Sequence, residues 1–391
     1  MKMSGGYTVA GLFAGIGGIE LGLHRSGHTT ELLCEIEPAA TAVLQARFPG
    51  IDIEPDVTAM RALPRVDVVA AGFPCQDLSQ AGRTAGISGL RSGLIGKVFD
   101  LISSTSSWKP RWLLLENVPF MLQLDGGRAM KFVTDELSRL GYMWAYRVVD
   151  TRAFGIPQRR LRVILLASPS EDPRSVLFVD DKRESAPALP AGRACGFYST
   201  EGTRGLGWAV DAVPTLKGGS SIGIASPPAI WMPDGRIVVP SISDAERLQG
   251  FRAGWTKVSG AKTKPIRTGV RWKLVGNAVS VPVSTWIGRR LREPGTPIDT
   301  VEKPLSELKA WPRAAWGRTG TTNAVEIGTW PARMRYHPLA GFLKRPLTPL
   351  SARAAEGFYN RALKSKLRFP PGFLDAVAAH LQSMGQRVEA A

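Results

Sequence analysis

Short apolar runs alternate with stretches of helical periodicity in the first part of the chain. Residues 7–13, 30–34, 67–71 and 112–115 are mainly apolar runs, which is typical of buried strands. Between these runs, apolar residues recur at helical spacing. Strands that alternate with helices are typical of a parallel sheet covered by helices. The pattern therefore predicts an α/β fold.

Further elements complete this first region. The pattern predicts helices at 38–48, 96–104 and 129–140, and strands at 143–149 and 162–167. A turn followed by an apolar-periodic helix occupies residues 275–291, and its form indicates that it returns to the first region.

The character of the chain changes after residue 168. Residues 171–240 are rich in proline and glycine and hold only short β-like pieces, such as Ile237–Val239, which indicates a loop-rich β domain. Helices are predicted at 243–251 and near 350–367 and 372–384. These shifts predict three parts, namely residues 1–168 completed by 275–292, residues 169–274, and a C-terminal extension over 293–391.

The net charge of the chain points to a polyanionic partner. The formal charge is +17 and the isoelectric point is near 10.2. Nucleic acid is favoured over a membrane surface, because no basic amphipathic helix stands out; a general solubility bias is the alternative. Residues 252–273 carry seven Lys and Arg and no acid, which suits a phosphate backbone.

Cysteine usage and hydropathy narrow the class further. Cys34, Cys75 and Cys195 show no CxxC spacing, so the sequence indicates neither a disulfide framework nor a metal site. No apolar run approaches the ~20 residues that a membrane span needs, and residues 1–7 lack the apolar part of a signal peptide. We therefore expect a cytoplasmic protein in a reducing compartment, without membrane contact. With a nucleic-acid partner it would be associated with the nucleoid, and we expect a monomer.

Cys75 follows the predicted strand at 67–71, after a break at Gly72 and Pro74. Open α/β sheets keep their chemistry at the C-terminal ends of strands. A thiol there is a candidate nucleophile if its pKa is lowered, and the glycine-rich loop that follows could close over a substrate. The alternative is a small buried apolar residue.

A glycine turn, Ala-Gly-Ile-Gly-Gly, joins the first predicted strand to the first helix. Such a turn lets the backbone approach a ligand, but its spacing differs from GxGxxG and does not specify a pyrophosphate. Glu35 ends the second strand about 20 residues later, which suits a ribose diol; a solvated strand end is the alternative. Ile36 could cover a purine. Asp56 could accept a hydrogen bond from an exocyclic amine or cap a helix.

Glu116 ends the predicted strand at 112–115 and is a proton-handling candidate, because partial burial raises the pKa of a carboxyl. Arg160 and Arg162 would share one face of a strand and could reach one ligand. A plain basic strand end is the alternative. In the C-terminal extension, Trp311, Trp316 and other tryptophans alternate with arginines, which fits either nucleic-acid stacking or core packing.

Six motifs occur together in one order. They are Phe-Ala-Gly-Ile-Gly-Gly at 13–18, Pro-Cys-Gln at 74–76, Glu-Asn-Val at 116–118, Gln-Arg-Arg-Leu-Arg at 158–162, Glu-Arg-Leu-Gln-Gly-Phe at 246–251 and Gly-Asn-Ala-Val at 276–279. With these motifs, residues 8–291 resemble the DNA (cytosine-5)-methyltransferases. The resemblance implies a Rossmann-like class I methyltransferase sheet with a smaller, loop-rich target-recognition domain.

The resemblance also implies roles for individual residues. S-adenosylmethionine would be bound by Phe13, Ala14, Gly15, Gly17, Gly18, Glu35, Ile36, Asp56, Val57, Pro74, Leu94, Asn277 and Ala278. The catalytic residues would be Cys75, Glu116, Arg160 and Arg162. Apart from the resemblance, the basic run at 252–273 makes Lys262, Lys264, Arg267 and Arg271 candidates for contact with double-stranded DNA, and we add Ser79 and Arg83 of the loop after Cys75.

In this family the thiolate adds to C6 of a flipped cytosine while the carboxyl bonds N3, and C5 then accepts the methyl group. The resemblance thus implies a methyltransferase of a restriction-modification or defence system, with a cognate endonuclease as a further partner. The segment between Leu166 and Ser241 holds seven Lys and Arg against eight acids, which is unexpected for a part that reads DNA. We therefore expect the extension from Glu293 onward to add duplex contacts. An RNA-directed relative and a catalytically idle DNA-binding relative are the alternatives.

Overall fold

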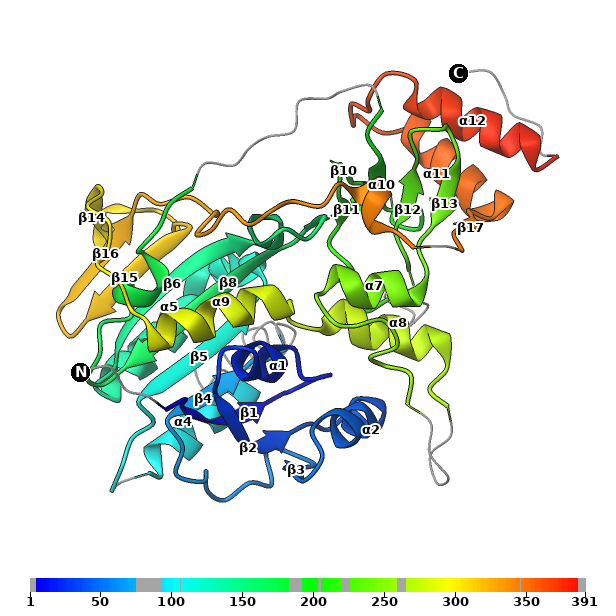
Figure 1. Ribbon diagram of the computed structural model, residues 1–391. Helices are drawn as coiled ribbons and strands as arrows, with labels where there is room; N and C mark the ends of the chain where they lie inside the picture. Colours follow the sequence, from blue (N-terminus) through cyan, green and yellow to red (C-terminus); the bar gives the residue numbers. More distant parts are fainter. Residues whose placement is uncertain are drawn as a thin grey trace. The chain divides into compact units, whose positions relative to one another are not determined.

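A ten-stranded sheet organises the larger part of the protein, in the order β14-β16-β15-β6-β8-β5-β4-β1-β2-β3 (Figure 1). The computed structural model describes residues 5–74, 93–105, 107–182, 192–202, 205–219, 226–258, 265–344 and 346–385. Within them the chain forms two compact units. Unit 1 comprises residues 1–153, 161–184 and 279–333, and unit 2 comprises residues 154–160, 185–278 and 334–391.

One half of the large sheet is parallel and ends at the edge strand β3. Its strands are β1 (Thr8–Leu12), β2 (Thr29–Cys34), β3 (Asp52–Glu54), β4 (Val68–Ala71) and β5 (Trp112–Asn117). Every residue of β4 and β5 is buried, as expected for strands with both faces covered. The predicted α/β fold is confirmed, and the apolar runs mark β1, β2, β4 and β5 to within about two residues.

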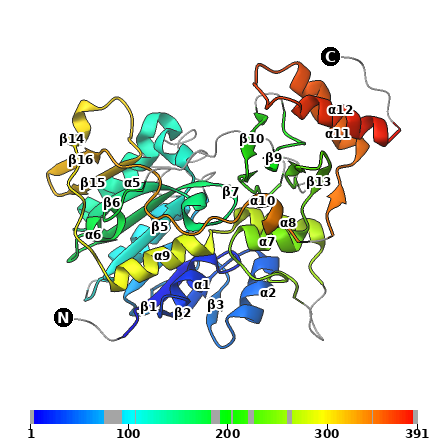
Figure 2. The ribbon, with the colours of Figure 1, turned by 45° about the horizontal axis from the view of Figure 1, so that its top comes forward.

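Helices cover both faces of this sheet. They are α1 (Gly18–His24), α2 (Pro38–Arg47), α4 (Leu94–Ser103), α5 (Arg128–Arg139), α6 (Arg174–Leu177) and α9 (Val281–Arg292), with short 3₁₀ turns at Pro119–Leu122, Leu124–Gly127, Thr151–Phe154 and Leu305–Glu307. α4 and α5 pack into the main core with alternate residues of the strands. α9 lies along α1 (Figure 2). The contact is close because a Cβ on Gly22 would lie 2.4 Å from Cβ of Ser284.

The antiparallel side of the sheet draws on the C-terminal extension. β8 (Leu161–Ser168) pairs with β5 and with β6 (Met143–Asp150), and β15 (Ala314–Arg318), β16 (Thr321–Val325) and β14 (Glu302–Pro304) continue beyond β6. Arg147 of β6 is fully buried and donates to the carbonyl of Gly328 at 2.8 Å, which ties the extension to the sheet.

The tryptophans of the extension are packed inside unit 1. The Trp311 ring lies 6.2 Å from that of Tyr146, and its Nε1 donates to the carbonyl of Gly127. Trp330 is buried, and the guanidinium of Arg174 lies 4.2 Å from the Trp316 ring. The structure therefore favours core packing over nucleic-acid stacking for these residues.

Unit 2 is built on a five-stranded antiparallel sheet. Its strands in order are β10 (Trp208–Val210), β9 (Cys195–Phe197), β12 (Ala229–Trp231), β13 (Ile237–Val239) and β17 (Thr348–Pro349). The unit also contains the pair β7 (Gln158–Arg159) and β11 (Val213–Pro214), and the helices α7 (Ile242–Leu248), α8 (Thr268–Asn277), α10 (Leu339–Phe342), α11 (Ala352–Leu363) and α12 (Phe373–Ser383).

The second core joins segments far apart in the sequence. Phe197 of β9 packs against Phe358 of α11 and Phe373 of α12, with ring centroids 4.6 and 5.0 Å apart. The extension is thus divided, because residues 293–333 belong to unit 1 and residues 334–385 to unit 2. No described helix has the length and apolar character needed to cross a membrane.

Candidate active site

The turn between β1 and α1 has unusual backbone geometry. Phe13 has φ +55°, and Gly15 and Gly17 have φ +58° and +79°. A positive φ is rare for an aromatic residue and is found where function requires the strain. Gly18 is required by packing, because a Cβ there would lie 2.3 Å from the carbonyl oxygen of Val279. Ala14 is fixed by a hydrogen bond from its N–H to the carbonyl of Cys34.

Glu35 fastens the end of β2 to this turn. Its Oε2 accepts from the N–H of Gly15 at 2.7 Å, and its Oε1 accepts from the N–H of Glu37 at 2.8 Å. A carboxylate oxygen can accept more than one hydrogen bond, so both oxygens keep acceptor capacity for a diol. Glu35 is therefore oriented before any ligand arrives.

The neighbouring positions differ in exposure. Ile36 is 70% exposed beside Glu35, whereas Val57 is buried. Asp56 accepts from the N–H of Thr58 at 2.8 Å, and that bond holds the pKa of the Asp56 carboxyl below its usual range. No helix begins at Thr58, so Asp56 orders a turn rather than a helix start. An exposed apolar side chain next to an oriented carboxylate suits a ligand with a flat apolar ring.

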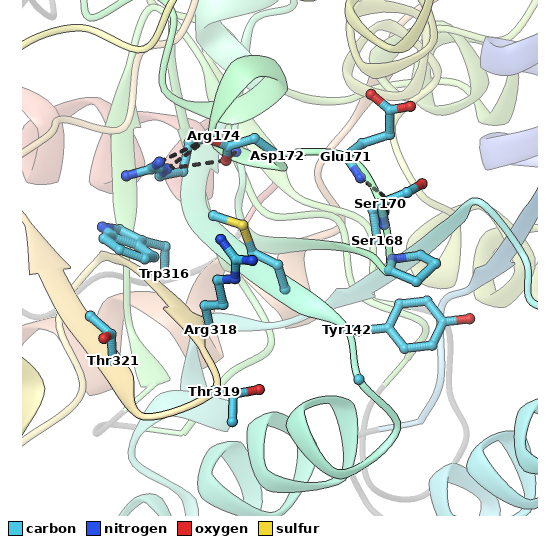
Figure 3. Close-up of a pocket in the computed structure, with 13 residues that line it drawn as sticks. Tyr142, Ser168, Ser170, Glu171, Asp172, Arg174, Trp316, Arg318, Thr319 and Thr321 are labelled. Atoms are coloured by element: carbon cyan, nitrogen blue, oxygen red, sulfur yellow. Dashed lines mark hydrogen bonds and ion pairs between the residues drawn. The ribbon is translucent and has the colours of Figure 1, made fainter.

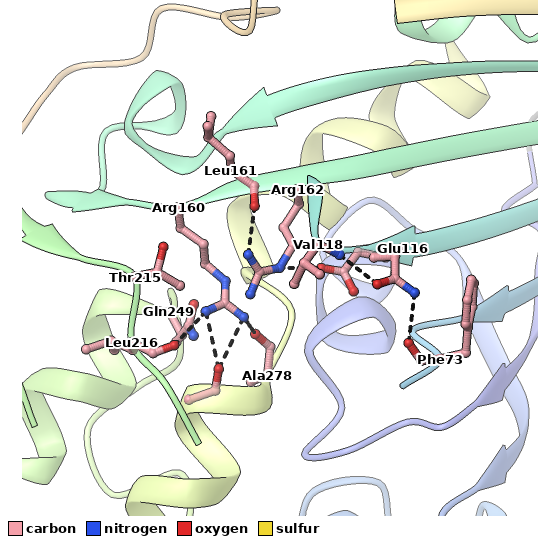
Figure 4. A network of polar contacts seen from close by, with 12 residues as sticks. Phe73, Glu116, Val118, Arg160, Leu161, Arg162, Thr215, Leu216, Gln249 and Ala278 are labelled. Atoms are coloured by element: carbon pink, nitrogen blue, oxygen red, sulfur yellow. Dashed lines mark hydrogen bonds and ion pairs between the residues drawn. The ribbon is translucent and has the colours of Figure 1, made fainter. Parts of the chain in front are cut away.

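Glu116 and Arg162 form an ion pair at the end of β5. Arg162 Nε lies 2.8 Å from Glu116 Oε1, and the side chains are 12% and 10% exposed (Figure 4). Gly72 leaves room beside the other oxygen, since a Cβ at residue 72 would lie 3.5 Å from Glu116 Oε2. Arg162 reaches Glu116 because β8 runs antiparallel to β5.

Asn117 links this carboxyl to the neighbouring strand end. Its Nδ2 donates to the carbonyl of Phe73 at 3.1 Å, and its Oδ1 accepts from the N–H of Val118 (Figure 4). Phe73 and Pro74 lead to Cys75, which lies outside the described residues together with Ser79, Arg83, Lys262 and Lys264. Asn117 therefore holds Phe73, which precedes Cys75 by two residues in the sequence, against the end of β5.

Arg160 has different partners from Arg162. It is buried in unit 2, where its guanidinium donates to the carbonyls of Leu216, Gly276 and Ala278 at 3.0, 3.2 and 2.7 Å (Figure 4). Arg160 precedes β8 rather than lying in it. The two arginines therefore do not alternate within one strand as expected, because β7 ends at Arg159, β8 begins at Leu161, and Arg160 lies between them. In the described residues, Arg160 orders the end of α8.

The remaining predicted residues lie on the edges of their elements. Leu94 begins α4 and is half-buried, and Pro74 is exposed. Asn277 is the last residue of α8. Its side chain packs against Gly218, because a Cβ on Gly218 would lie only 2.2 Å from Asn277 Oδ1. Ala278 follows and is buried.

The two described basic residues of the predicted DNA-binding set behave differently. Arg271 is ion-paired with the fully buried Glu246 at 2.9 Å and donates to Thr256 Oγ1. Arg267 is exposed at the start of α8. Arg271 therefore holds the loop before α8, and Arg267 is accessible.

Sequence reasoning overlooked Glu20. This residue of α1 is 1% exposed, and burial raises the pKa of its carboxyl to about 7. In the sequence it resembles an ordinary polar position of an amphipathic helix. The one sequence feature connected with its burial is the glycine at residue 11 of β1, because a Cβ there would lie 2.2 Å from Glu20 Oε1.

A cavity of about 490 Å³ lies elsewhere in unit 1. It is lined by Ser168 at the end of β8 and by Glu171 and Asp172 just after that strand, together with Trp316 and Arg318 of β15 (Figure 3). Because β8 runs antiparallel to β5, the C-terminal end of β8 lies beside the start of β5, whereas Glu116 lies near the opposite end of that strand. The cavity is therefore separate from the site around Glu116.

Comparison with solved structures defines the class of the fold. The S. pombe Dnmt2 methyltransferase superposes with a TM-score of 0.55 at 15% identity, over 73% of this chain and 98% of that chain. The Entamoeba histolytica methyltransferase EhMeth gives a TM-score of 0.51 at 14% identity, over 74% and 98%. The fold is that of the class I methyltransferases.

Comparison of sequences defines the family. The model of the C-5 cytosine-specific DNA methylases matches residues 7–189. The Type II methyltransferase M2.BsuMI of Bacillus subtilis (strain 168) is 53% identical over 363 residues, which is 91% of this chain and 93% of that protein. M.NlaX of Neisseria lactamica is 28% identical over 73% of this chain and 96% of that protein. The chain belongs to the C-5 cytosine-specific DNA methylases, which confirms the expected family and enzyme class.

Proposed function

We propose that the protein transfers the methyl group of S-adenosylmethionine to C5 of a cytosine flipped out of duplex DNA. The observation that carries this proposal is the Glu116–Arg162 ion pair, which Asn117 ties to the strand end before Cys75. The carboxyl lies on β5, and Cys75 follows β4, the parallel neighbour of β5, by four residues in the sequence. Adjacent strand ends suit two groups that must act on one six-membered ring.

The methyl donor would be held by unit 1 at the ends of β1 and β2. Glu35 would accept hydrogen bonds from the ribose hydroxyls, and Ile36 with Val57 would enclose the adenine. The residues fit this ligand, because Glu35 is oriented and a Cβ on Gly15 would have no neighbour within 4 Å. When bound, the donor supplies an electrophilic methyl group on a sulfonium.

The protein's own groups make cytosine reactive. C5 is a weak nucleophile until the Cys75 thiolate adds to C6, while Glu116 gives a hydrogen bond or proton to N3. The electron pair at C5 then takes the methyl group, the C5 proton leaves to water, and the Cys75–C6 bond breaks. Arg162 orients Glu116 throughout. The base must leave the duplex because C6 is inaccessible inside the stack.

Unit 2 would recognise DNA, and its C-terminal part contributes charge. Residues 334–385 contain eight Lys and Arg but only two acids, Glu356 and Asp375. Three of the basic residues, Lys364, Lys366 and Arg368, are exposed on the loop after α11, which we call the basic loop (residues 364–368). The loop is anchored to β10, because Trp208 Nε1 donates to the carbonyl of Arg368.

The biological role proposed is that of a Type II modification enzyme, as the names of the relatives indicate for those proteins. Methylation would protect host sites from a cognate endonuclease. Neither a metal nor a second subunit enters the proposed chemistry.

Methyl transfer to duplex DNA tests the proposed function. We expect 5-methylcytosine by nucleoside mass spectrometry and, in an expressing host, by bisulfite sequencing of genomic DNA. Cys75→Ser should abolish turnover, because an alcohol is a far weaker nucleophile than a thiolate, and should leave donor binding measurable. Methylation of tRNA alone, or at N4 of cytosine, would reject the proposal. Loss of donor binding in Cys75→Ser would show that the pocket is misassigned.

A further inference from the structure

Glu20 is an acid buried beside the β1–α1 turn. Its side chain is 1% exposed, and within the described residues its Oε2 has no hydrogen-bond partner. Burying a carboxylate without a partner costs free energy, so such a group is retained where something pairs with it. The backbone N–H of Glu20 donates one hydrogen bond to this carboxyl, which leaves Oε2 as the oxygen without a partner. A buried acid with such an oxygen beside a ligand site is therefore a candidate for ligand contact.

The position of the carboxyl is set by Gly11. Ala10 and Leu12 face the core formed with α4 and α5, so Gly11 between them faces α1 on the other side of the sheet. A Cβ on Gly11 would lie 2.2 Å from Glu20 Oε1 and 2.9 Å from Cδ. The missing side chain at residue 11 thus provides the space that the Glu20 carboxyl fills.

The surroundings of Glu20 supply no positive charge from the described residues. Desolvation is the main reason that its pKa is raised, and the like charge of Glu35 at the end of β2 adds to it. α9, packed on α1, brings the neutral residues Ser284 and Thr285 to this region. β4, the other neighbour of β1, brings Ala70 opposite Gly11. Among the described residues, no cation competes with a cationic ligand for this acid.

The order of the strands relates Glu20 to the donor. β1 lies between β2, whose end carries Glu35, and β4, which leads to Cys75. A donor with its ribose at Glu35 and its methyl group directed toward Cys75 must cross the end of β1 with its methionyl part. This part carries a sulfonium and an ammonium group.

We propose that Glu20 is the counter-charge for the cationic methionyl part of the methyl donor. The inference rests on the donor named in the proposed function. Without ligand the carboxyl holds a proton near neutral pH, and with the cation present it is ionised. Donor binding thus releases a proton from Glu20, and Glu20 is a binding residue of the donor site.

Isothermal titration calorimetry tests this coupling on the full-length protein. S-adenosylmethionine and S-adenosylhomocysteine are titrated at pH 6, 7 and 8 in buffers of different ionisation enthalpy, with wild type, Glu20→Gln and the control Glu31→Gln on an exposed position of β2. We expect wild type to gain about tenfold in affinity from pH 6 to pH 8 and to release a proton, relative to Glu20→Gln. The amino group of the ligand titrates in every variant, so the difference between variants reports Glu20.

The outcomes separate the possibilities. Proton release with both ligands assigns the ammonium as the partner, and release with S-adenosylmethionine alone assigns the sulfonium. Equal affinity and equal proton release in wild type and Glu20→Gln would overturn the role of Glu20 but not the donor. Absence of binding by wild type at every pH would reject the donor itself. Should Glu20→Gln not fold, proton release by wild type no greater than that of the ligand's own amino group would also overturn the proposal.

Discussion

Three glutamate carboxyl groups lie near the ends of the central strands, and different local contacts give each of them different chemical properties. Glu35 is held by two backbone N–H groups, and Glu116 is held by the guanidinium of Arg162. Glu20 is buried against a glycine and raised in pKa. Orientation, ion pairing and desolvation thus suit the three groups to their proposed roles as an acceptor for hydroxyls, a partner for a ring nitrogen and a group that exchanges a proton.

The raised pKa of Glu20 predicts a pH dependence of stability. The folded state binds this proton more tightly than the unfolded chain, with pKa values of about 7 and 4.5. The stabilisation is complete below pH 4.5 and is lost as the pH rises through 7, about 3 kcal/mol in all. Chemical unfolding should therefore show wild type losing stability relative to Glu20→Gln between pH 5 and 8. The Glu31→Gln variant should follow wild type, and parallel curves for all three proteins would refute the shift.

Residue-level contacts over long sequence distances were the least predictable part of the site. The motif order identified Glu116 and Arg162, but their pairing depends on the antiparallel register of β5 and β8. The spacing of Arg160 and Arg162 suggested a shared ligand, whereas Arg160 binds carbonyls from α8 and the loop before it. Nothing local distinguishes Glu20 from a solvated helix position.

At the scale of elements, the apolar runs predicted what packs on both faces. β4 and β5 are buried throughout and were evident from the sequence, as was α5. β15 and β16 have weak patterns, since their stability depends on pairing with β6 rather than on their own composition. Short strands at the edge of a sheet depend on their partners more than on their own residues.

The basic loop after α11 is expected to contact the DNA backbone. Replacing Lys364, Lys366 and Arg368 by alanine should weaken duplex binding and make the plot of log affinity against log salt concentration shallower by about 2 to 3 units, because up to three phosphate contacts are lost. Fluorescence anisotropy with a labelled duplex measures both quantities. Donor affinity should stay unchanged.

A matched control for the basic loop exists in unit 1. Lys303, Lys309 and Arg313 are exposed basic residues of the extension and carry the same total charge. Their alanine variant should keep the salt dependence of wild type. An equal loss in both triple variants would mean that net charge, rather than the basic loop, governs binding.

At the scale of the whole molecule, the extension completes both units instead of forming a third. Residues 293–333 add β14, β15 and β16 to the large sheet, and residues 334–385 supply β17 and the helices over the small sheet. The division was not visible in the sequence, because short edge strands and core tryptophans read equally well as a nucleic-acid-binding segment. Deleting the whole extension would damage both cores and could not isolate DNA contacts.

Phe358 provides a sharper test of this arrangement. Its ring is buried against Phe197 and Phe373, so Phe358→Ala should destabilise unit 2 by about 3 to 5 kcal/mol. Differential scanning calorimetry should show a lowered transition together with loss of duplex binding. Leu363→Ala, at a 43% exposed position of the same helix, should cause little change. A normal transition in Phe358→Ala would contradict the observed packing.

The pairing of β15 with β6 also bears on how the protein is made. During translation, β6 is synthesised more than 150 residues before its neighbour β15, and Phe197 a similar distance before Phe358. When the ribosome has synthesised the last of the six motifs, neither β15 nor the helices that pack on the small sheet have yet been made. A prematurely terminated product would therefore expose an open strand edge on β6 and an uncovered aromatic face at Phe197.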